Sequence, residues 1–192
     1  LGSKGKKLAR EIKNADVFYY TGISAGILDA KQKKDLIHIG STAVICGFDF
    51  NYRSQLHNDK KVSQLLFKKI SENVDINFVS FDDVKELFDI KNPYEVFEIL
   101  NDKKNLILIR YKDSIIFKNK QEVIKTVKVR HGEVVDTTAA GDAFNGSFLA
   151  LINNDKNIPI VENILKSHSV TREVIKHKGA IISNKNMPNI NT

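Results

Sequence analysis

The stretch Asp136-Thr-Thr-Ala-Ala-Gly-Asp-Ala-Phe-Asn-Gly146 decides how the whole sequence is interpreted. Its small residues 139–141 let the backbone approach a ligand closely, and the apolar run from Ala143 to Ile152 predicts a helix directly after them. The first turn of a helix carries free N–H groups at the positive end of its dipole. The loop is therefore suited to bind an anion such as a phosphate.

Asp142 lies in the first turn of this predicted helix. A carboxylate beside a phosphate repels it unless the carboxylate has a task, and one such task is to accept the proton of an attacking hydroxyl group. A simpler alternative is a capped helix, in which Asp or Thr is the N-cap and the Ala and Gly residues allow close packing. The string taken by itself leaves both interpretations open.

Around this loop, apolar runs alternate with amphipathic stretches. The predicted strands are 17–20, 43–48, 76–79, 106–109, 115–117 and 123–128, and the predicted helices are 4–14, 28–38, 60–72, 82–88, 93–100 and 159–175. Such alternation indicates βαβ units and an α/β fold with a mainly parallel sheet and helices on both faces. Asp113-Ser114 predicts a hairpin turn. In the helix 60–72, the side expected to be buried consists of Val62, Leu65, Leu66, Phe67 and Ile70.

The composition narrows the class of protein. The 192 residues are 42% hydrophobic and 28% charged, as in globular domains, and no apolar run is long enough to cross a membrane. The lone cysteine, Cys46, lies in an apolar run and is expected to be buried in a reducing, cytoplasmic protein. The net charge of +7 comes from scattered lysines, which indicates a solvated surface; a nucleic-acid binder with salt-sensitive affinity stays as an alternative.

The string 136–146 resembles the signature of the ribokinase-like (PfkB) carbohydrate kinases, D-T-x-G-A-G-D followed by A/S-F. Ala139 stands where that family usually has a glycine, and the D-T-T-A-A-G-D form resembles the 2-keto-3-deoxygluconate kinases within it. An alanine here could restrict the loop, because Ala tolerates positive φ poorly. The resemblance extends from about Asn14 to Pro188.

Further segments resemble the same subgroup. Phe48-Asp-Phe-Asn-Tyr-Arg53 resembles its D-x-N-x-R segment, and Ser80-Phe-Asp-Asp83 resembles its S-x-D-D variant of the family's N-x-x-E. Thr21-Gly22 stands where the family has an S-G segment near the sugar. The string 178–182 with Met187-Pro188 resembles the C-terminal end of the subgroup.

The resemblance implies a ribokinase-like three-layer αβα fold with a mainly parallel central sheet. It further implies that residues 1–192 are the C-terminal two-thirds of one kinase domain. The family's N-terminal strands and lid would then precede Leu1, which is not a methionine. A homo-oligomer is expected for the longer protein, and no membrane or nucleic-acid partner is expected.

The implied activity is ATP-dependent phosphorylation of a primary hydroxyl of a small sugar acid, with 2-keto-3-deoxygluconate as the expected acceptor. Asp142 is the implied catalytic base, and Arg53 is expected to contact the sugar carboxylate or the transferred phosphoryl group. The other implied contacts are Thr138, Ala139, Ala140 and Gly141 with the ATP phosphates, Gly22 and Ile23 with the sugar, and Asp83 with Mg²⁺ through water.

Two alternatives to this activity stay open. The first is a kinase of the same fold that acts on another sugar, of the fructokinase, ribokinase or adenosine kinase type. The second is a ligand-binding protein that keeps the nucleotide loop and performs no chemistry. Assays with different hydroxyl acceptors separate the first alternative, and ATP binding without turnover would indicate the second.

Overall fold

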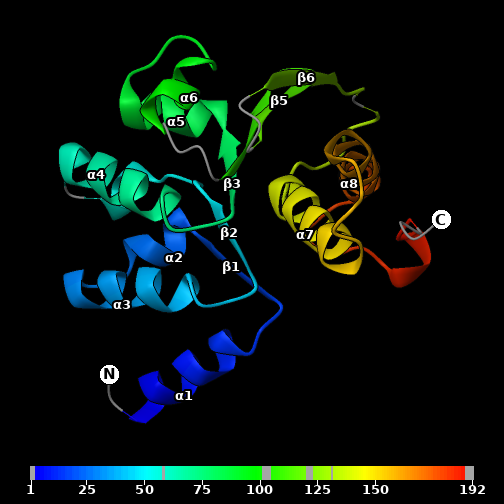
Figure 1. Cartoon of the computed structure of the whole chain (residues 1–192). Coiled ribbons are helices and arrows are strands. Elements are labelled where there is room, and N and C mark those ends of the chain that lie inside the picture. Colours follow the sequence, from blue (N-terminus) through cyan, green and yellow to red (C-terminus); the bar gives the residue numbers. More distant parts are fainter. Residues whose placement is uncertain (1–2, 58, 101–104, 120–122, 131, 189–192) are drawn as a thin grey trace. The chain divides into compact units, whose positions relative to one another are not determined.

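The computed structural model describes residues 3–57, 59–100, 105–119, 123–130 and 132–188. The chain divides into two compact units (Figure 1). The first unit is Leu1–Tyr111 with Ile116–Lys125, and the second is Lys112–Ile115 with Thr126–Thr192. The expectation that residues 1–192 belong to one kinase domain stays a prediction.

The strands form one sheet in which every strand lies beside its neighbour in sequence. They are β1 (Val17–Thr21), β2 (Ile45–Asp49), β3 (Ile76–Ser80), β4 (Leu106–Tyr111), β5 (Ser114–Lys118) and β6 (Ile124–Lys128). The first four run parallel, as expected for βαβ units. Only Lys112 and Asp113 separate β4 from β5, so this pair is an antiparallel hairpin whose turn lies one residue before the predicted Asp113-Ser114. All six predicted strands are confirmed, with bounds that shift by up to two residues.

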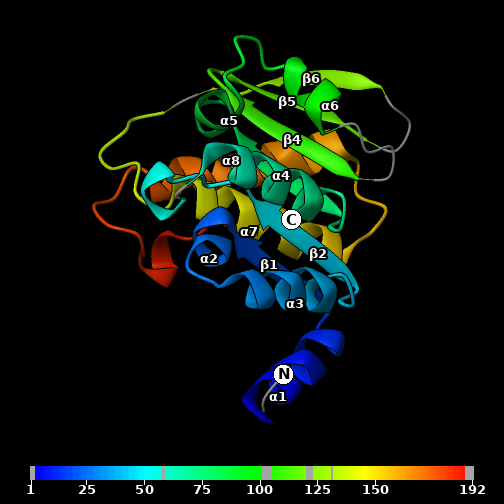
Figure 2. The same ribbon diagram turned by 90° about the vertical axis from the view of Figure 1, so that its left-hand side faces the viewer.

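The helices of the first unit lie before β1 and between successive strands. They are α1 (Ser3–Lys13), α2 (Gly22–Gly26), α3 (Ala30–Gly40), α4 (Lys60–Ser71), α5 (Phe81–Phe88) and α6 (Glu95–Ile99), and only α2 was not predicted. Because β1 to β4 follow one another in a single direction, crossovers of one hand place their helices on one face of the sheet. Figures 1 and 2 show α2, α3, α4 and α5 on the same side of these strands.

Aromatic rings pack between α4 and the sheet. The ring centroids of Phe48 in β2 and of Phe50 just after it lie 5.6 and 5.4 Å from that of Phe67 on α4, and all three side chains are fully buried. The predicted apolar side of α4 is partly wrong, because Val62 and Leu65 are 62% and 70% exposed. The buried stripe instead holds Ser63, Phe67, Ile70 and Ser71, since spacings of three and four residues keep side chains on one side of a helix.

The second unit is built around two helices that pack together, α7 (Ala140–Asn154) and α8 (Ile160–Val174). Phe144 and Phe148 stack within α7 at 6.0 Å. The buried Asn163 of α8 donates through Nδ2 to the carbonyl of Phe148 at 3.2 Å and so ties the two helices together. The helix predicted after the Gly/Ala loop is confirmed, and it begins at Ala140.

Two other expectations from the sequence can be compared with the structure. Cys46 is buried in β2, with only 1% of its surface exposed, as its apolar neighbours predicted. None of the helices in the described ranges is long and apolar enough to span a membrane. The cytoplasmic setting stays a prediction.

The packing of Gly22 gives a stability prediction. A Cβ atom at this position would lie 2.0 Å from the carbonyl oxygen of Phe50 and 2.7 Å from Cζ of Phe67. Overpacking of this kind should make Gly22→Ala lower the free energy of unfolding by about 3 kcal/mol or more. Urea-induced unfolding, followed by circular dichroism, measures the change.

Gly146→Ala is the matched control, because a Cβ there would meet nothing within 4 Å. Gly146 lies inside α7, where alanine should raise the free energy of unfolding by up to about 1 kcal/mol. Equal effects of the two substitutions would contradict the packing described for Gly22.

Candidate functional site

In the first unit, charged side chains gather where the parallel strands end. Asp49 is the last residue of β2 and is in register with Thr21 of β1 and Phe78 of β3. Arg110, near the end of β4, is in register with Ser80. Carboxyl ends of parallel strands in open α/β sheets are where ligands bind, so this edge is a candidate for one part of a functional site.

The structure brings together Arg53 and Asp83, two residues that the sequence singled out separately. Nη1 of Arg53 lies 3.2 Å from Oδ1 of Asp83, and it donates a second bond of 2.7 Å to the carbonyl of Tyr52. Burial raises the pKa of the Asp83 carboxyl above its usual range, and the positive charge of Arg53 partly offsets this effect. Oδ2 of Asp83 has no hydrogen-bond partner within the described parts of the chain.

Asp49 was quoted within the D-x-N-x-R segment but was not proposed as a site residue. Only 2% of its surface is exposed. The hydroxyl of Tyr19 donates to its Oδ2 at 3.5 Å, and Nη2 of Arg110 lies 3.6 Å from its Oδ1. A charged residue at the end of an apolar strand was the signal available in the sequence. No sequence signal links Asp49 to Arg110, because a third strand separates them.

The two residues expected near the sugar lie in α2, directly after β1. Thr21 is the N-cap of this helix, and its hydroxyl accepts a hydrogen bond from the Ser24 N–H at 3.2 Å. Gly22 is buried beneath the backbone of Phe50, so its lack of a side chain has a packing cause. Ile23 is 37% exposed. Sugar contacts of Gly22 and Ile23 stay predictions.

In the second unit, the loop before α7 has an unusual backbone. Ala139 is the N-cap and adopts a left-handed conformation with φ 61° and ψ 13°. It makes no side-chain capping bond, so the alternative in which Asp or Thr is the N-cap is not what the structure shows. A left-handed conformation costs a non-glycine residue roughly 1–2 kcal/mol, and such strain is often found at functional sites.

Of the first three amides of α7, one has an acceptor within the loop and two have none in the described residues. Ala140 donates its N–H to the carbonyl of Thr137 at 3.1 Å. The N–H groups of Gly141 and Asp142 bond to nothing within the described residues. The carboxylate of Asp142 is exposed and likewise has no hydrogen bond or ion pair there. An unpaired carboxylate thus stands beside free backbone donors.

Asp136 holds this loop in shape. Its Oδ1 accepts bonds from the N–H and the hydroxyl of Thr138 at 2.8 and 2.6 Å, and its Oδ2 accepts from the Gly179 N–H at 2.9 Å. These bonds, those from Thr138 first, hold the pKa of Asp136 below its usual range. Thr138, an expected phosphate contact, is therefore already bonded to Asp136.

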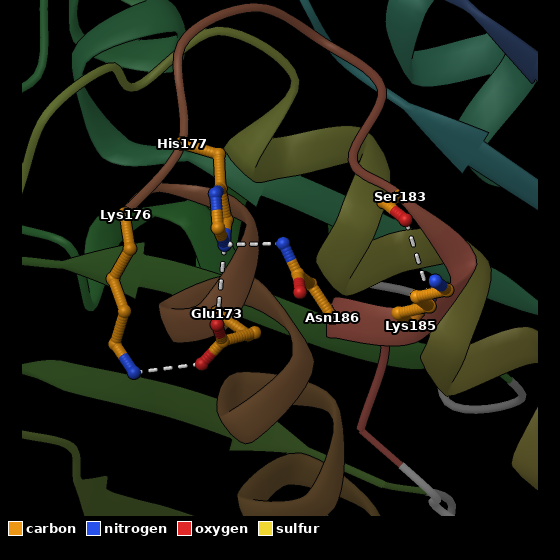
Figure 3. Close-up of polar contacts among 6 residues, drawn as sticks. All are labelled: Glu173, Lys176, His177, Ser183, Lys185 and Asn186. Atoms are coloured by element: carbon orange, nitrogen blue, oxygen red, sulfur yellow. Dashed lines mark hydrogen bonds and ion pairs between the residues drawn. The ribbon is translucent and has the colours of Figure 1, made fainter.

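The segment after α8 is anchored by a second polar group, shown in Figure 3. Glu173 accepts a bond from Nζ of Lys176 at 2.6 Å, and its other oxygen lies 3.2 Å from Nε2 of His177. Nδ2 of Asn186 lies 3.4 Å from the same nitrogen. These contacts hold the segment after α8 in place, and the bond from Gly179 to Asp136 joins that segment to the loop before α7.

The comparisons with known proteins identify the family. The model of the pfkB family of carbohydrate kinases matches residues 3–187, and the chain belongs to this family. A curated relative, the 2-dehydro-3-deoxygluconokinase of Escherichia coli, is 30% identical over 191 residues, which cover 94% of this chain and 61% of that protein. The enzyme of the same name from Haemophilus influenzae is 31% identical over 184 residues, which cover 92% of this chain and 58% of that protein.

A solved structure supports the fold. The fructokinase from Xylella fastidiosa, determined with bound ATP, aligns with a TM-score of 0.76 and 18% identity, over 93% of this chain and 60% of that one. The expected class, a ribokinase-like α/β fold with a mainly parallel sheet, is confirmed. The chain spans about 60% of the length of the relatives that it matches.

The strained Ala139 gives a second stability prediction. Ala139→Gly should raise the free energy of unfolding by up to about 1 kcal/mol, because glycine adopts positive φ without steric cost although it adds entropy to the unfolded chain. Ala150→Gly, at an exposed position inside α7, should instead lower it by about 1 kcal/mol. Thermal and urea unfolding of both variants measures the difference. If Ala139→Gly were as destabilising as Ala150→Gly, the left-handed conformation would be contradicted.

Proposed function

We propose that this chain belongs to an ATP-dependent kinase that phosphorylates the primary hydroxyl of 2-keto-3-deoxygluconate. The observation that carries the proposal is the carboxylate of Asp142, which is exposed and without a partner in the described residues, beside the free N–H groups that begin α7. A carboxylate serving stability would be expected to have a bonding partner, as Asp136 and Asp83 do. One serving catalysis must be accessible to its substrate.

In the proposed reaction, an oxygen of the sugar attacks the γ-phosphorus of ATP. The bond from that phosphorus to the β,γ-bridging oxygen breaks, ADP leaves, and Asp142 accepts the hydroxyl proton. The N–H groups at 141 and 142, with the dipole of α7, stabilise the negative charge that is being transferred. The left-handed Ala139 directs the chain so that these donors stay unbonded within the loop.

Arg53 and Asp83 have complementary roles in this proposal. The planar guanidinium of Arg53 suits a sugar carboxylate or a phosphoryl group, and its bonds to Tyr52 and Asp83 hold it in one orientation. Oδ2 of Asp83 fits a contact with a water bound to Mg²⁺, an ion that keeps several waters and uses few protein carboxylates. The Mg²⁺ ion, when bound, would neutralise charge on the nucleotide phosphates.

The choice of acceptor rests on the relatives. Curated proteins that are 26–31% identical over more than nine-tenths of this chain carry the name 2-dehydro-3-deoxygluconokinase, a synonym for a kinase of this keto-acid. An ATP-dependent 6-phosphofructokinase of Thermoanaerobacterium thermosaccharolyticum is 30% identical over 169 residues. The acceptor is therefore tested directly, with the keto-deoxy acid, fructose, fructose 6-phosphate, ribose and adenosine compared in the complete gene product.

Preference for the keto-deoxy acid supports the proposal, and preference for another acceptor overturns the substrate but leaves a kinase. If ATP binds but no acceptor is phosphorylated, the non-catalytic nucleotide-binding alternative is favoured. Salt-sensitive binding of DNA or RNA would favour the remaining alternative.

Asp142→Asn tests the base. Asparagine cannot accept the proton, so kcat should fall by about 10²- to 10⁴-fold with little change in the circular dichroism spectrum. Glu162→Gln is the control, because Glu162 is an exposed acid in the first turn of α8, and kcat should stay within twofold of the wild type (~0.4 kcal/mol or less). A variant Asp142→Asn that kept most of its turnover would remove Asp142 from this role.

Arg53→Lys tests recognition of the acid group. Lysine keeps the charge but loses the planar fork, so KM for the keto-deoxy acid should rise by about tenfold or more, while KM for ATP changes little. The exposed Arg10 of α1, replaced by Lys in the same way, serves as the control. A parallel rise in KM for both substrates would argue that Arg53 contributes to folding instead of acceptor binding.

A further inference from the structure

The imidazole of His57 lies in an aromatic box close to Arg53. Its ring stacks on Tyr52 with centroids 5.1 Å apart and planes at 27°, and it meets Phe67 edge-on at 5.4 Å. The backbone of α2 closes over the ring, since a Cβ on Gly26 would lie 3.3 Å from Nε2 of His57. This Nε2 is buried and has no hydrogen-bond partner within the described residues.

A buried nitrogen without a hydrogen-bond partner costs stability, so it calls for an explanation. A purely apolar ring would fill the same space without this cost. The neutral imidazole is tolerated in the box, but an imidazolium would need to donate from a nitrogen that faces no acceptor. The box is therefore a site that distinguishes the two protonation states of His57.

His57 and Arg53 hold the same short segment. A 3₁₀ turn, Ser54–Leu56, joins them, with Arg53 as its N-cap and His57 as its C-cap. The N–H of His57 donates to the carbonyl of Ser54 at 3.0 Å. Tyr52 takes part at both ends, because its ring stacks on His57 and its carbonyl accepts from Arg53. Loss of the His57 ring from the box would loosen the residue that orients Arg53.

The groups around His57 oppose its protonation. Burial and the positive charge of Lys33 on α3 both lower the pKa of His57. From α4, the contact is the ring of Phe67, and Asp59, the N-cap of α4, is already bonded to the Val62 N–H at 3.0 Å. Neither α2 nor the ring of Tyr52 brings an opposite charge.

We propose that His57 is a positioning residue for Arg53, and that protonation of His57 opens the segment 52–57 and weakens the binding of an acidic sugar. This inference rests on the proposed function of Arg53. Because the folded pKa lies below the ordinary value of about 6.5, the packed segment is fully stable above that pH and loses stability as the pH falls below it.

The test compares wild type with His57→Phe, which keeps an aromatic ring in the box but cannot be protonated. KM for the keto-deoxy acid is measured at saturating ATP between pH 5.5 and 8. The wild-type KM should rise by about threefold or more relative to that of His57→Phe as the pH falls to about 5.5, since a tenfold change per pH unit is the upper limit for one proton. Effects of other titrating groups cancel in this ratio, and kcat should show no such divergence.

His57→Ala removes the ring, so its KM should be raised at every pH. Equal KM profiles for wild type and His57→Phe would overturn the proposal, and so would a His57→Ala variant with the KM of wild type. An independent measurement does not need turnover. Hydrogen exchange gives the protection of the amides of residues 52–57, and the protection in wild type is divided by that in His57→Phe at each pH. This ratio should fall below pH 6.5. If it falls while no acceptor is phosphorylated, the proposed function fails and the opening of the segment stands.

Discussion

The parallel register of β1 to β4 is the constraint on which the rest of the first unit depends. It aligns Thr21, Asp49 and Phe78, so that the strands end at one edge and their charged side chains share it. Because side chains alternate along a strand, a slip of one residue would bring Phe48 to the place of Asp49 and remove the packing of Phe48 against Phe67. The apolar core and the charged edge are thus fixed by the same set of backbone hydrogen bonds.

The charged groups fall into two kinds, those with hydrogen-bond partners and one without a partner in the described residues. Arg53, Asp83 and Asp136 are bonded to neighbours that hold their orientation. Asp142 has no such partner in the described part of its unit and remains exposed. A charged side chain with a partner is held in one orientation and adds modestly to the stability of the fold. A carboxylate that acts as a base must instead remain accessible to the group whose proton it accepts. The loop before α7 keeps Asp142 available through backbone conformation, with a left-handed residue where a side-chain cap would otherwise stand.

Two short segments, one in each unit, are both held in place by contacts from outside the segment. In the turn after Arg53, the ring of His57 packs against Tyr52 and against Phe67 of α4. The loop before Asp142 is held by the bonds of Asp136, one of which comes from Gly179 in the segment after α8. Such support keeps binding groups in place before a ligand arrives, which lowers the entropic cost of binding. In the turn after Arg53, the supporting ring of His57 is titratable, so the proposed stability of this segment depends on pH.

The sequence by itself determined the six strands, the α-helices other than α2 and the loop 136–142, because apolar periodicity and small-residue strings are local properties of the chain. Only the tertiary structure decided that Arg53 meets Asp83 and that Arg110 reaches Asp49, since these contacts join residues that are distant in sequence. It also decided that Val62 and Leu65 face outward, because the neighbours of a helix, more than its own pattern, determine which side is covered. The strain at Ala139 had one local sign, an alanine where glycine is usual, but its backbone angles are seen only in the folded loop, where Asp136 bonds to Thr138 and to Gly179.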